Sequence, residues 1–183
     1  MDDMKKIEIE RLISALLKQY GYKEEKDDYL DIVAFTRSLG FNIINAKQPE
    51  SEDGFIVIRP DSAQNKDGFG DKIIVVNSDR TFEWKRFVIA HEFAHSILHY
   101  QVGDLYLHRE NKKGKSIEEN EADYFAAALL MPRISFDRIY KELRERELTG
   151  NALLLQLASI YKVPLASVSR RVDEVIEMEL IHE

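Results

Sequence analysis

Apolar residues recur every three or four positions through much of the chain, which is the spacing of helices that bury one face. This pattern predicts helices over residues 4–19, 27–39, 84–99, 118–132, 135–148, 152–162 and 165–179. Gly21 and Gly40 are expected to end the first two helices, and Asp27 or Asp28 is expected to cap the start of the second. Neither of these two helices carries a chemical motif, so their predicted role is packing.

Between the second and third predicted helices the pattern changes to short β-branched runs with turn residues at their ends. These runs predict strands over residues 41–45, 54–59 and 72–77. We expect a small three-stranded sheet with antiparallel pairing, packed beside the third helix. The interval 60–71 is rich in Asp, Asn and Gly and is expected to be a loop.

Composition describes an ordinary soluble protein of one domain, or of one domain with a small appendage. The 183 residues are 44% hydrophobic and 32% charged, with a net charge of −7. The absence of cysteine excludes disulfides and thiolate metal sites and fits a cytoplasmic protein. The charged residues 1–10 lack a signal-peptide core, and no apolar run reaches about 18 residues. We therefore expect a cytoplasmic protein without a membrane partner.

Candidate chemistry is concentrated in the third predicted helix, at His91-Glu92-Phe93-Ala94-His95. Residues four apart share one face of a helix, so His91 and His95 can hold one cation, and Glu92 can reach a water on it. This is the helix motif of zinc proteases, in which the Glu is the general base. The pentapeptide alone fits equally well two histidines on a half-buried helix. A third ligand is needed for a catalytic zinc.

The next predicted helix opens with the three glutamates that could supply this ligand, Glu118, Glu119 and Glu121. Glu119 is the expected ligand because Asp123 lies four residues on, on the same face, where it can accept the outer N–H of a ligand histidine. Glu121 lies about 200° round the helix from Glu119, and Glu118 about 100°. Both are expected to be solvated charges. Together with the two histidines, Glu119 would hold one Zn²⁺ per chain.

The two motifs together resemble those of a known family. Residues 86–99 contain Arg-Phe-Val-Ile-Ala-His-Glu-Phe-Ala-His, and residues 119–132 read Glu-Asn-Glu-Ala-Asp-Tyr-Phe-Ala-Ala-Ala-Leu-Leu-Met-Pro. This pair is similar to the two metal-bearing helices of the ImmA/IrrE metallo-endopeptidases, and the likeness is dense over residues 86–132. It implies zinc ligands at the positions of His91, His95 and Glu119, with the base at Glu92. It also implies a helix-turn-helix transcriptional repressor as the protein that is cleaved, in mobile elements or stress responses of bacteria and phages.

Residues 100–117 connect the two metal-bearing helices and are expected to form a mobile lid over the cleft. One side chain near the site should stabilise the oxyanion of a tetrahedral intermediate. The candidates are His99, Tyr100, Tyr106 and His108, and nothing in the sequence selects among them. For His99, support of a metal ligand and simple packing are further alternatives.

The last two predicted helices, in residues 151–183, resemble a helix-turn-helix unit, with Lys162 in the turn and Pro164 at the start of the second helix. This segment carries three basic and five acidic residues. A DNA-reading helix needs positive charge around it, so we expect a packed hairpin and no nucleic-acid partner. The expected division is a peptidase domain over residues 1–150 and a hairpin over 151–183 that packs on the same domain.

The sequence therefore predicts an α+β, mainly helical, zincin-like metallopeptidase that cleaves a specific cytoplasmic protein. The alternative is a non-catalytic, metal-containing regulator that binds a repressor, an antitoxin or DNA. A complete ligand set with a base favours the enzyme. In proteases with this helix motif an edge strand holds extended substrate, and residues 72–77 are the expected strand. The alternative for that strand is complete pairing inside the sheet.

Overall fold

The computed structural model describes residues 1–59, 70–100, 106–109 and 116–180, with only the backbone described for 106–109 and 176–180. Most of the predicted loop 60–71 and most of the predicted lid therefore lie outside the described residues. The chain forms two compact units, one of residues 31–126 and one of residues 1–30 and 127–183. Helices dominate and one small sheet is present, so the predicted α+β, mainly helical class is confirmed.

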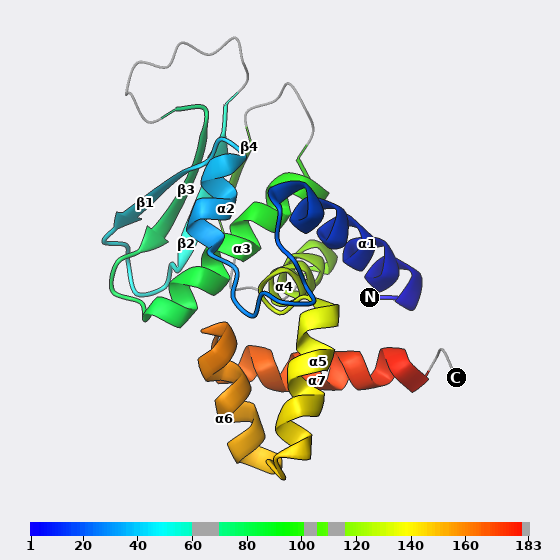
Figure 1. Ribbon diagram of the computed structural model, residues 1–183. Coiled ribbons are helices and arrows are strands. Elements are labelled where there is room, and N and C mark those ends of the chain that lie inside the picture. The colour runs from blue at the N-terminus through cyan, green and yellow to red at the C-terminus, as the bar shows by residue number, and fades with distance from the viewer. Residues whose placement is uncertain (60–69, 101–105, 110–115, 181–183) are drawn as a thin grey trace. The chain divides into compact units, whose positions relative to one another are not determined.

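The sheet belongs to the unit of residues 31–126 (Figure 1). Its strands are β1 (Asn42–Ala46), β2 (Gly54–Ile58), β3 (Lys72–Asn77) and β4 (Tyr106–Arg109), in the spatial order β1-β3-β2-β4. The three predicted strands are present, and β4 joins them from within the connection that was expected to be a lid. Pairing is mixed, because β3 is parallel to β1 and antiparallel to β2.

The position of β3 overturns one expectation from the sequence. Residues 72–77 were expected to be the edge strand for an extended substrate. In the structure β3 is hydrogen-bonded to β1 on one side and to β2 on the other. Its backbone groups are already used in the sheet, so a peptide cannot add to it. The alternative of a wholly paired strand is the correct one.

Helices α2 (Ile32–Ser38) and α3 (Phe82–Leu98) accompany the sheet (Figure 1), and α3 packs against β2 and β3. The approach is closest at Gly54. A Cβ there would lie 2.6 Å from both the carbonyl oxygen of Val75 and Cγ1 of Val88, so only glycine fits. This tight contact sets the height of α3 above the sheet.

An aromatic cluster centred on Phe93 fixes the rotation of α3. The Phe93 ring makes edge-on contacts with Phe35 and Phe41, with centroids 5.6 Å and 5.5 Å away. It also contacts Phe125 of α4 (Ile117–Leu130), at 6.0 Å. Since Phe93 lies between the two histidines of the motif, its burial determines which way they point.

Helix α2 is shorter than predicted, because it begins at Ile32 and not near Asp27. Asp31 is its N-cap and accepts hydrogen bonds from the backbone N–H groups of Val33 and Ala34. The Asp27 carboxylate instead accepts from the backbone N–H of Lys23, at 2.8 Å. This bond closes a turn before the helix, a competing use that the sequence pattern does not reveal.

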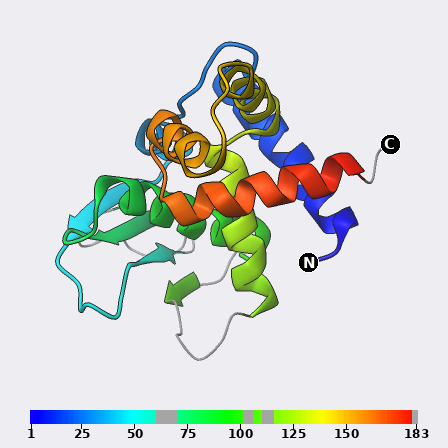
Figure 2. The ribbon, with the colours of Figure 1, turned by 90° about the horizontal axis from the view of Figure 1, so that it is seen from below.

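The second unit contains α1 (Asp3–Tyr20), α5 (Arg133–Glu145), α6 (Gly150–Tyr161) and α7 (Leu165–Leu180), and includes the end of α4. Helix α7 follows α6 after a sharp bend (Figure 2). The bend is 106°, and Lys162 between the two helices is in the left-handed conformation. This bend lies in the range of helix-turn-helix units. The predicted division at residue 150 stays a prediction.

One buried cation ties α7 into this unit. The Arg171 side chain is fully buried, its Nη1 lies 2.6 Å from the Glu10 carboxylate of α1, and its Nε donates to the carbonyl of Met131. Figure 2 shows α7 crossing α1. A basic residue in the second helix of the helix-turn-helix-like unit is therefore buried in the interior.

Within the described residues, no single helix is both long enough and apolar enough to cross a membrane. Helices α6 and α7 reach that length and composition only when they are taken together, across their bend.

Candidate metal centre

Helix α3 presents both histidines of the motif on one buried face. It begins after Thr81, whose side chain accepts a hydrogen bond from the Trp84 N–H. No Gly or Pro interrupts the helix, so His91 and His95 lie one turn apart. His95 is fully buried and His91 is 8% exposed. Their Nε2 atoms lie 3.1 Å from each other, so the two imidazoles point at the same place.

Helix α4 brings the Glu119 carboxylate next to the Nε2 atoms of His91 and His95. One of its oxygens lies 3.2 Å from His91 Nε2, and the other lies 3.5 Å from His95 Nε2. The side chain is 13% exposed. Of the candidate glutamates, Glu119 is the one whose ligand atoms join the two histidines within the described residues.

The donor set fits a small divalent metal ion. Ions with bonds of about 2.0–2.1 Å in tetrahedral geometry hold their ligand atoms about 3.3 Å apart. The separations of 3.1, 3.2 and 3.5 Å among the Nε2 atoms and the Glu119 oxygens bracket that value. Two imidazole nitrogens and one carboxylate leave a fourth position open, as catalytic sites do. The group of His91, His95 and Glu119 could therefore hold a metal.

Asp123 occupies the position that the sequence predicted for it. Its Oδ1 lies 3.0 Å from Nδ1 of His91. A carboxylate only accepts, so His91 Nδ1 is the donor, and the Nε2 lone pair is left free to face the Glu119 side. An outer carboxylate of this kind orients a ligand imidazole and raises its basicity.

Electrostatics around His91 favour a positive charge. Burial alone lowers the pKa of His91, but hydrogen bonds to Asp123 and Glu119, together with the charge of Glu92, raise it to about 10. In the absence of a metal, a proton on His91 satisfies these carboxylates. The same surroundings attract a metal cation, which competes for that nitrogen.

Glu92 directly follows the first histidine and is 2% exposed. Its charge contributes to the raised pKa of His91, so its carboxylate lies close enough to affect the site. A buried carboxylate beside a metal-binding group is suited to accept a proton from water. Its role as the base stays a prediction.

Glu121 departs from expectation, whereas the contact of His99 with His95 is among the alternatives that the sequence left open. His99 Nδ1 lies 3.0 Å from His95 Nδ1, and His99 Nε2 lies 3.2 Å from a carboxylate oxygen of Glu121. Glu121 was expected to be solvated, but its side chain is 15% exposed and is paired with His99. Helix spacing places His99 near the face of the two ligand histidines, but it does not indicate the contact with Glu121, which joins two helices.

The other oxyanion candidates are less clearly placed. Tyr100 is half-buried, and its backbone N–H donates to the carbonyl of His95. Tyr106 and His108 lie on β4, but their side chains fall outside the described residues. A choice among these three stays a prediction.

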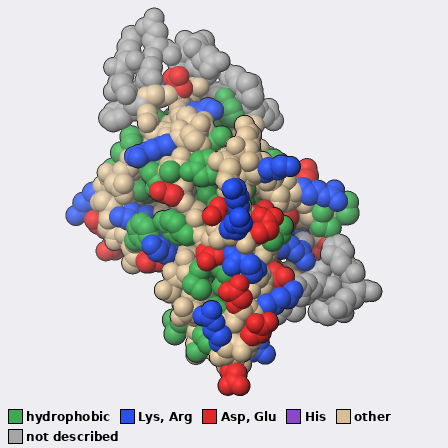
Figure 3. Space-filling view, viewed as in Figure 1, with side chains coloured by type: hydrophobic (Ala, Val, Ile, Leu, Met, Phe, Trp, Pro, Cys, Tyr) green, Lys and Arg blue, Asp and Glu red, His purple; other side chains and the backbone are tan. Residues whose placement is uncertain are grey.

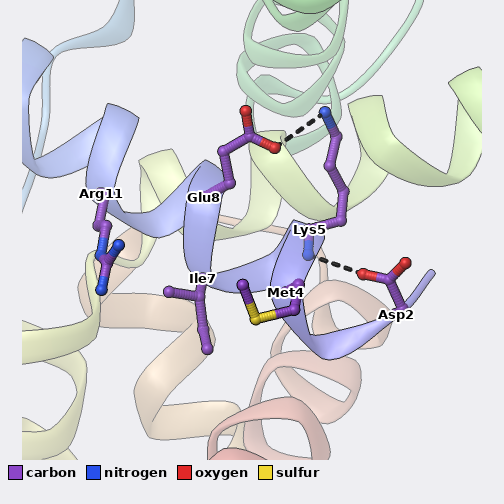
Figure 4. Close-up of a pocket in the computed structure, with 6 residues that line it drawn as sticks. All are labelled: Asp2, Met4, Lys5, Ile7, Glu8 and Arg11. Carbon is purple, nitrogen blue, oxygen red and sulfur yellow. Dashed lines mark hydrogen bonds and ion pairs between the residues drawn. The ribbon is translucent and has the colours of Figure 1, made fainter.

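A surface hollow elsewhere offers no comparable chemistry. It has a volume of about 470 Å³ and is lined by the first turns of α1 (Figure 4). There Lys5 Nζ pairs with Glu8 at 3.3 Å, and the backbone N–H of Lys5 donates a hydrogen bond to the Asp2 carboxylate at 2.8 Å. These groups pair with one another along a single helix, so the converging ligand atoms of α3 and α4 remain the candidate site.

Comparisons with known proteins bear on the fold and the family of the chain. No curated protein matches the chain significantly. Among solved structures, a Mycobacterium tuberculosis transcriptional regulator is similar in fold, with a TM-score of 0.54 and 16% sequence identity. The match covers 93% of this chain and 47% of that protein, so this chain spans about half its length.

The sequence model of the Peptidase_M78 family, described as the IrrE N-terminal-like domain, matches residues 49–173. That range is more than half of the chain and includes α3 and α4. It also includes the three residues whose ligand atoms converge, His91, His95 and Glu119. The resemblance to the ImmA/IrrE family is thereby confirmed. It supports protease activity and metal binding in general terms, or an IrrE-like regulator role. The chain belongs to the Peptidase_M78 family.

Proposed function

We propose that this chain is a zinc-dependent endopeptidase that cleaves one specific cytoplasmic protein, a helix-turn-helix transcriptional repressor. The observation that carries the proposal is the convergence of His91, His95 and Glu119, with buried Glu92 beside them. Family membership supports the reaction class. The cytoplasm follows from the proposed substrate, since a repressor acts on DNA there.

The chain's own residues supply the positioning and the proton transfer. His91, His95 and Glu119 would hold Zn²⁺, which when bound acts as a Lewis acid that lowers the pKa of water and polarises a carbonyl. Glu92 accepts a proton from the attacking water and delivers a proton to the nitrogen of the leaving amine. Asp123, at 3.0 Å from His91 Nδ1, keeps the ligand tautomer of that imidazole.

Extended substrate needs an edge strand, and β4 is the strand we propose in place of β3. It is the last strand in the order β1-β3-β2-β4 and pairs antiparallel with β2 through residues 106–109. Among the described residues no strand pairs with its other edge. Strand β4 also follows the metal-bearing helix α3 directly in the chain. A peptide could therefore add to this edge through backbone hydrogen bonds alone. Oxyanion stabilisation is assigned to one of Tyr100, Tyr106 and His108.

The charge of the chain favours a basic protein partner over nucleic acid. Net charge is −7, and acidic and basic side chains are interspersed on the face shown in Figure 3. Arg171 is buried against Glu10, and Arg170 is paired with Glu174 at 2.8 Å. A repressor carries a basic DNA-binding surface, so attraction to an acidic protease would speed their encounter.

A second candidate is a non-catalytic, metal-containing regulator that binds its partner without cutting it. Two observations support this second candidate function. The matched domain is described as IrrE N-terminal-like, and the solved protein of similar fold is titled a transcriptional regulator. Turnover of a protein substrate separates the two functions.

The experiment incubates the zinc-loaded protein with the repressor encoded beside its gene, and with an unrelated unfolded protein. Wild type should make a single cut in an exposed or transiently opened segment of the repressor and should leave the unfolded protein largely intact. Glu92→Gln should keep the metal and the fold while losing about 10²- to 10⁴-fold in rate, because its amide cannot accept a proton.

Three outcomes would count against the proposal. Full cleavage by Glu92→Gln excludes the base. Equal degradation of both proteins excludes selective recognition. A stable complex with the repressor that yields no fragments establishes the non-catalytic regulator.

A further inference from the structure

His99 lies at the end of α3 with both ring nitrogens engaged. It is the C-cap residue, and its backbone N–H bonds to the carbonyl of His95. Its Nδ1 lies 3.0 Å from His95 Nδ1, and its Nε2 lies 3.2 Å from Glu121. The side chains of His99 and Glu121 are only 10% and 15% exposed. The contacts form a buried line from His95 through His99 to a carboxylate.

Proton positions along this line follow from its two ends. Glu121 is a carboxylate and only accepts, so His99 Nε2 carries the N–H that points at it. In a neutral imidazole the other nitrogen is then an acceptor, so His99 Nδ1 receives a hydrogen bond from His95 Nδ1. His95 Nε2 is thereby left with its lone pair, and it faces His91 and Glu119.

The opposite proton arrangement would disable the site. If His99 carried its proton on Nδ1, two lone pairs would face each other at Nε2 and Glu121. His95 would then accept at Nδ1 and hold its proton on Nε2, which faces the ligand group. A protonated Nε2 cannot bind a metal, because the ligand must be the deprotonated nitrogen.

We propose that His99 and Glu121 are a positioning pair that holds His95 in its metal-binding tautomer. The inference rests on the proposed metal site. It gives each ligand histidine its own outer carboxylate from α4: Asp123 contacts His91 directly, and Glu121 acts on His95 through His99. This role replaces the sequence-based suggestion that His99 holds an oxyanion, since neither ring nitrogen faces away from these partners.

The test measures Zn²⁺ affinity by competition with a chromophoric chelator, without any proteolysis. His99→Leu removes both hydrogen bonds and should weaken Zn²⁺ binding about 10- to 100-fold, the usual effect of losing an outer partner. His99→Gln can accept from His95 and donate to Glu121, so it should keep affinity within a few-fold of wild type. Glu121→Gln should fall between the two. Glu118→Gln, at an exposed position on the same helix, is the matched control and should change nothing.

A spectroscopic signature separates positioning from a merely structural role. Two-bond ¹⁵N–¹H spectra of the histidines in the zinc-loaded protein should show His95 protonated on Nδ1 and His99 protonated on Nε2. In His99→Leu the metal-free protein should unfold cooperatively, which shows that a lost affinity is not a lost fold. If this variant does not fold, the affinities of Glu121→Gln and His99→Gln and the wild-type tautomers decide the question.

The outcomes distinguish this inference from the metal site on which it rests. A wild-type protein that binds no Zn²⁺ overturns both. Wild-type binding that persists at full strength in His99→Leu, or a His99 ring protonated on Nδ1 in the zinc-loaded protein, overturns the positioning pair and leaves the metal site standing.

Discussion

Arg171 in the helical unit and His91 in the unit with the sheet are both buried ionisable side chains with carboxylate neighbours, yet their surroundings differ. Arg171 donates through Nη1 to Glu10 and through Nε to the carbonyl of Met131, so these two donors end on acceptors. Around His91, two Nε2 atoms and the Glu119 carboxylate turn acceptors toward one another, 3.1 to 3.5 Å apart.

The difference indicates which buried charge is structural and which is functional. A buried donor surrounded by acceptors is complete, and removing one partner leaves the other uncompensated. Converging acceptors are incomplete without a cation, and only a proton or a metal relieves them.

The largest effect should follow removal of a metal ligand. His91→Ala, His95→Ala and Glu119→Gln should each weaken Zn²⁺ binding by more than about 100-fold, beyond the usual loss for an outer partner. Glu118→Gln serves as the control. Zinc content after dialysis and the competition titration measure this. Metal retained by Glu119→Gln but lost from Glu121→Gln would show that the ligand is misassigned.

Zinc affinity should depend steeply on pH, because a proton and the metal compete for His91. The pKa of His91 is raised to about 10, so metal-free protein is protonated there at neutral pH. Apparent affinity should rise about tenfold per pH unit from pH 6 to 8 as that one proton is displaced. Titrations in buffers of different ionisation enthalpy count the protons released. A flat profile would contradict the proposed competition.

Breaking the complete pair should change stability and leave metal binding alone. Arg171→Met removes the buried cation that lies 2.6 Å from the Glu10 carboxylate and should lower the free energy of unfolding by about 3–5 kcal/mol. The double variant with Glu10→Leu should recover part of that loss, since a buried pair can be replaced by apolar groups. Denaturant unfolding and Zn²⁺ titration measure both. A large fall in zinc affinity with the fold intact would remove the distinction between the two units.

The smallest effect concerns Glu174, near the same arginine. Burial raises its pKa, although Arg171 and Arg170 oppose this. A raised pKa in the folded state means that its contribution to stability is present at low pH and is lost as pH rises through that pKa. Glu174→Gln should therefore gain stability relative to wild type between pH 4 and pH 7. Unfolding curves at both values test the sign, and a relative loss on raising the pH contradicts it.

Much of the fold follows from local pattern. His91 and His95 are four residues apart, as are Glu119 and Asp123. Residues at this spacing share a helix face, so their placement can be predicted from sequence alone. The strands were also found, because β-branched runs differ from helical spacing. The start of α2 differs from the prediction, since Asp27 and Asp31 look alike in sequence and only the turn at Lys23 distinguishes them.

Features that join distant segments were not predictable in this way. Strand order placed β3 inside the sheet, and it depends on pairing with β1 and β2 across long loops. The contact of His99 with Glu121 joins two helices. The angle between Glu121 and Glu119 around their own helix separates Glu121 from the ligand position, but it carries no information about a partner on another helix.

Helix α4 places three carboxylates within five residues. Glu119 contacts His91 and His95, Asp123 contacts His91, and Glu121 contacts His99 at the C-cap of α3. A one-residue insertion after Glu119 would keep every acidic residue, yet would turn the last two carboxylates about 100° round the helix. Among related chains, the spacing Glu-x-Glu-x-Asp is therefore a stricter criterion for a working site than the number of acidic residues. A substitution of Asn120 should be tolerated better than an insertion or deletion in this segment.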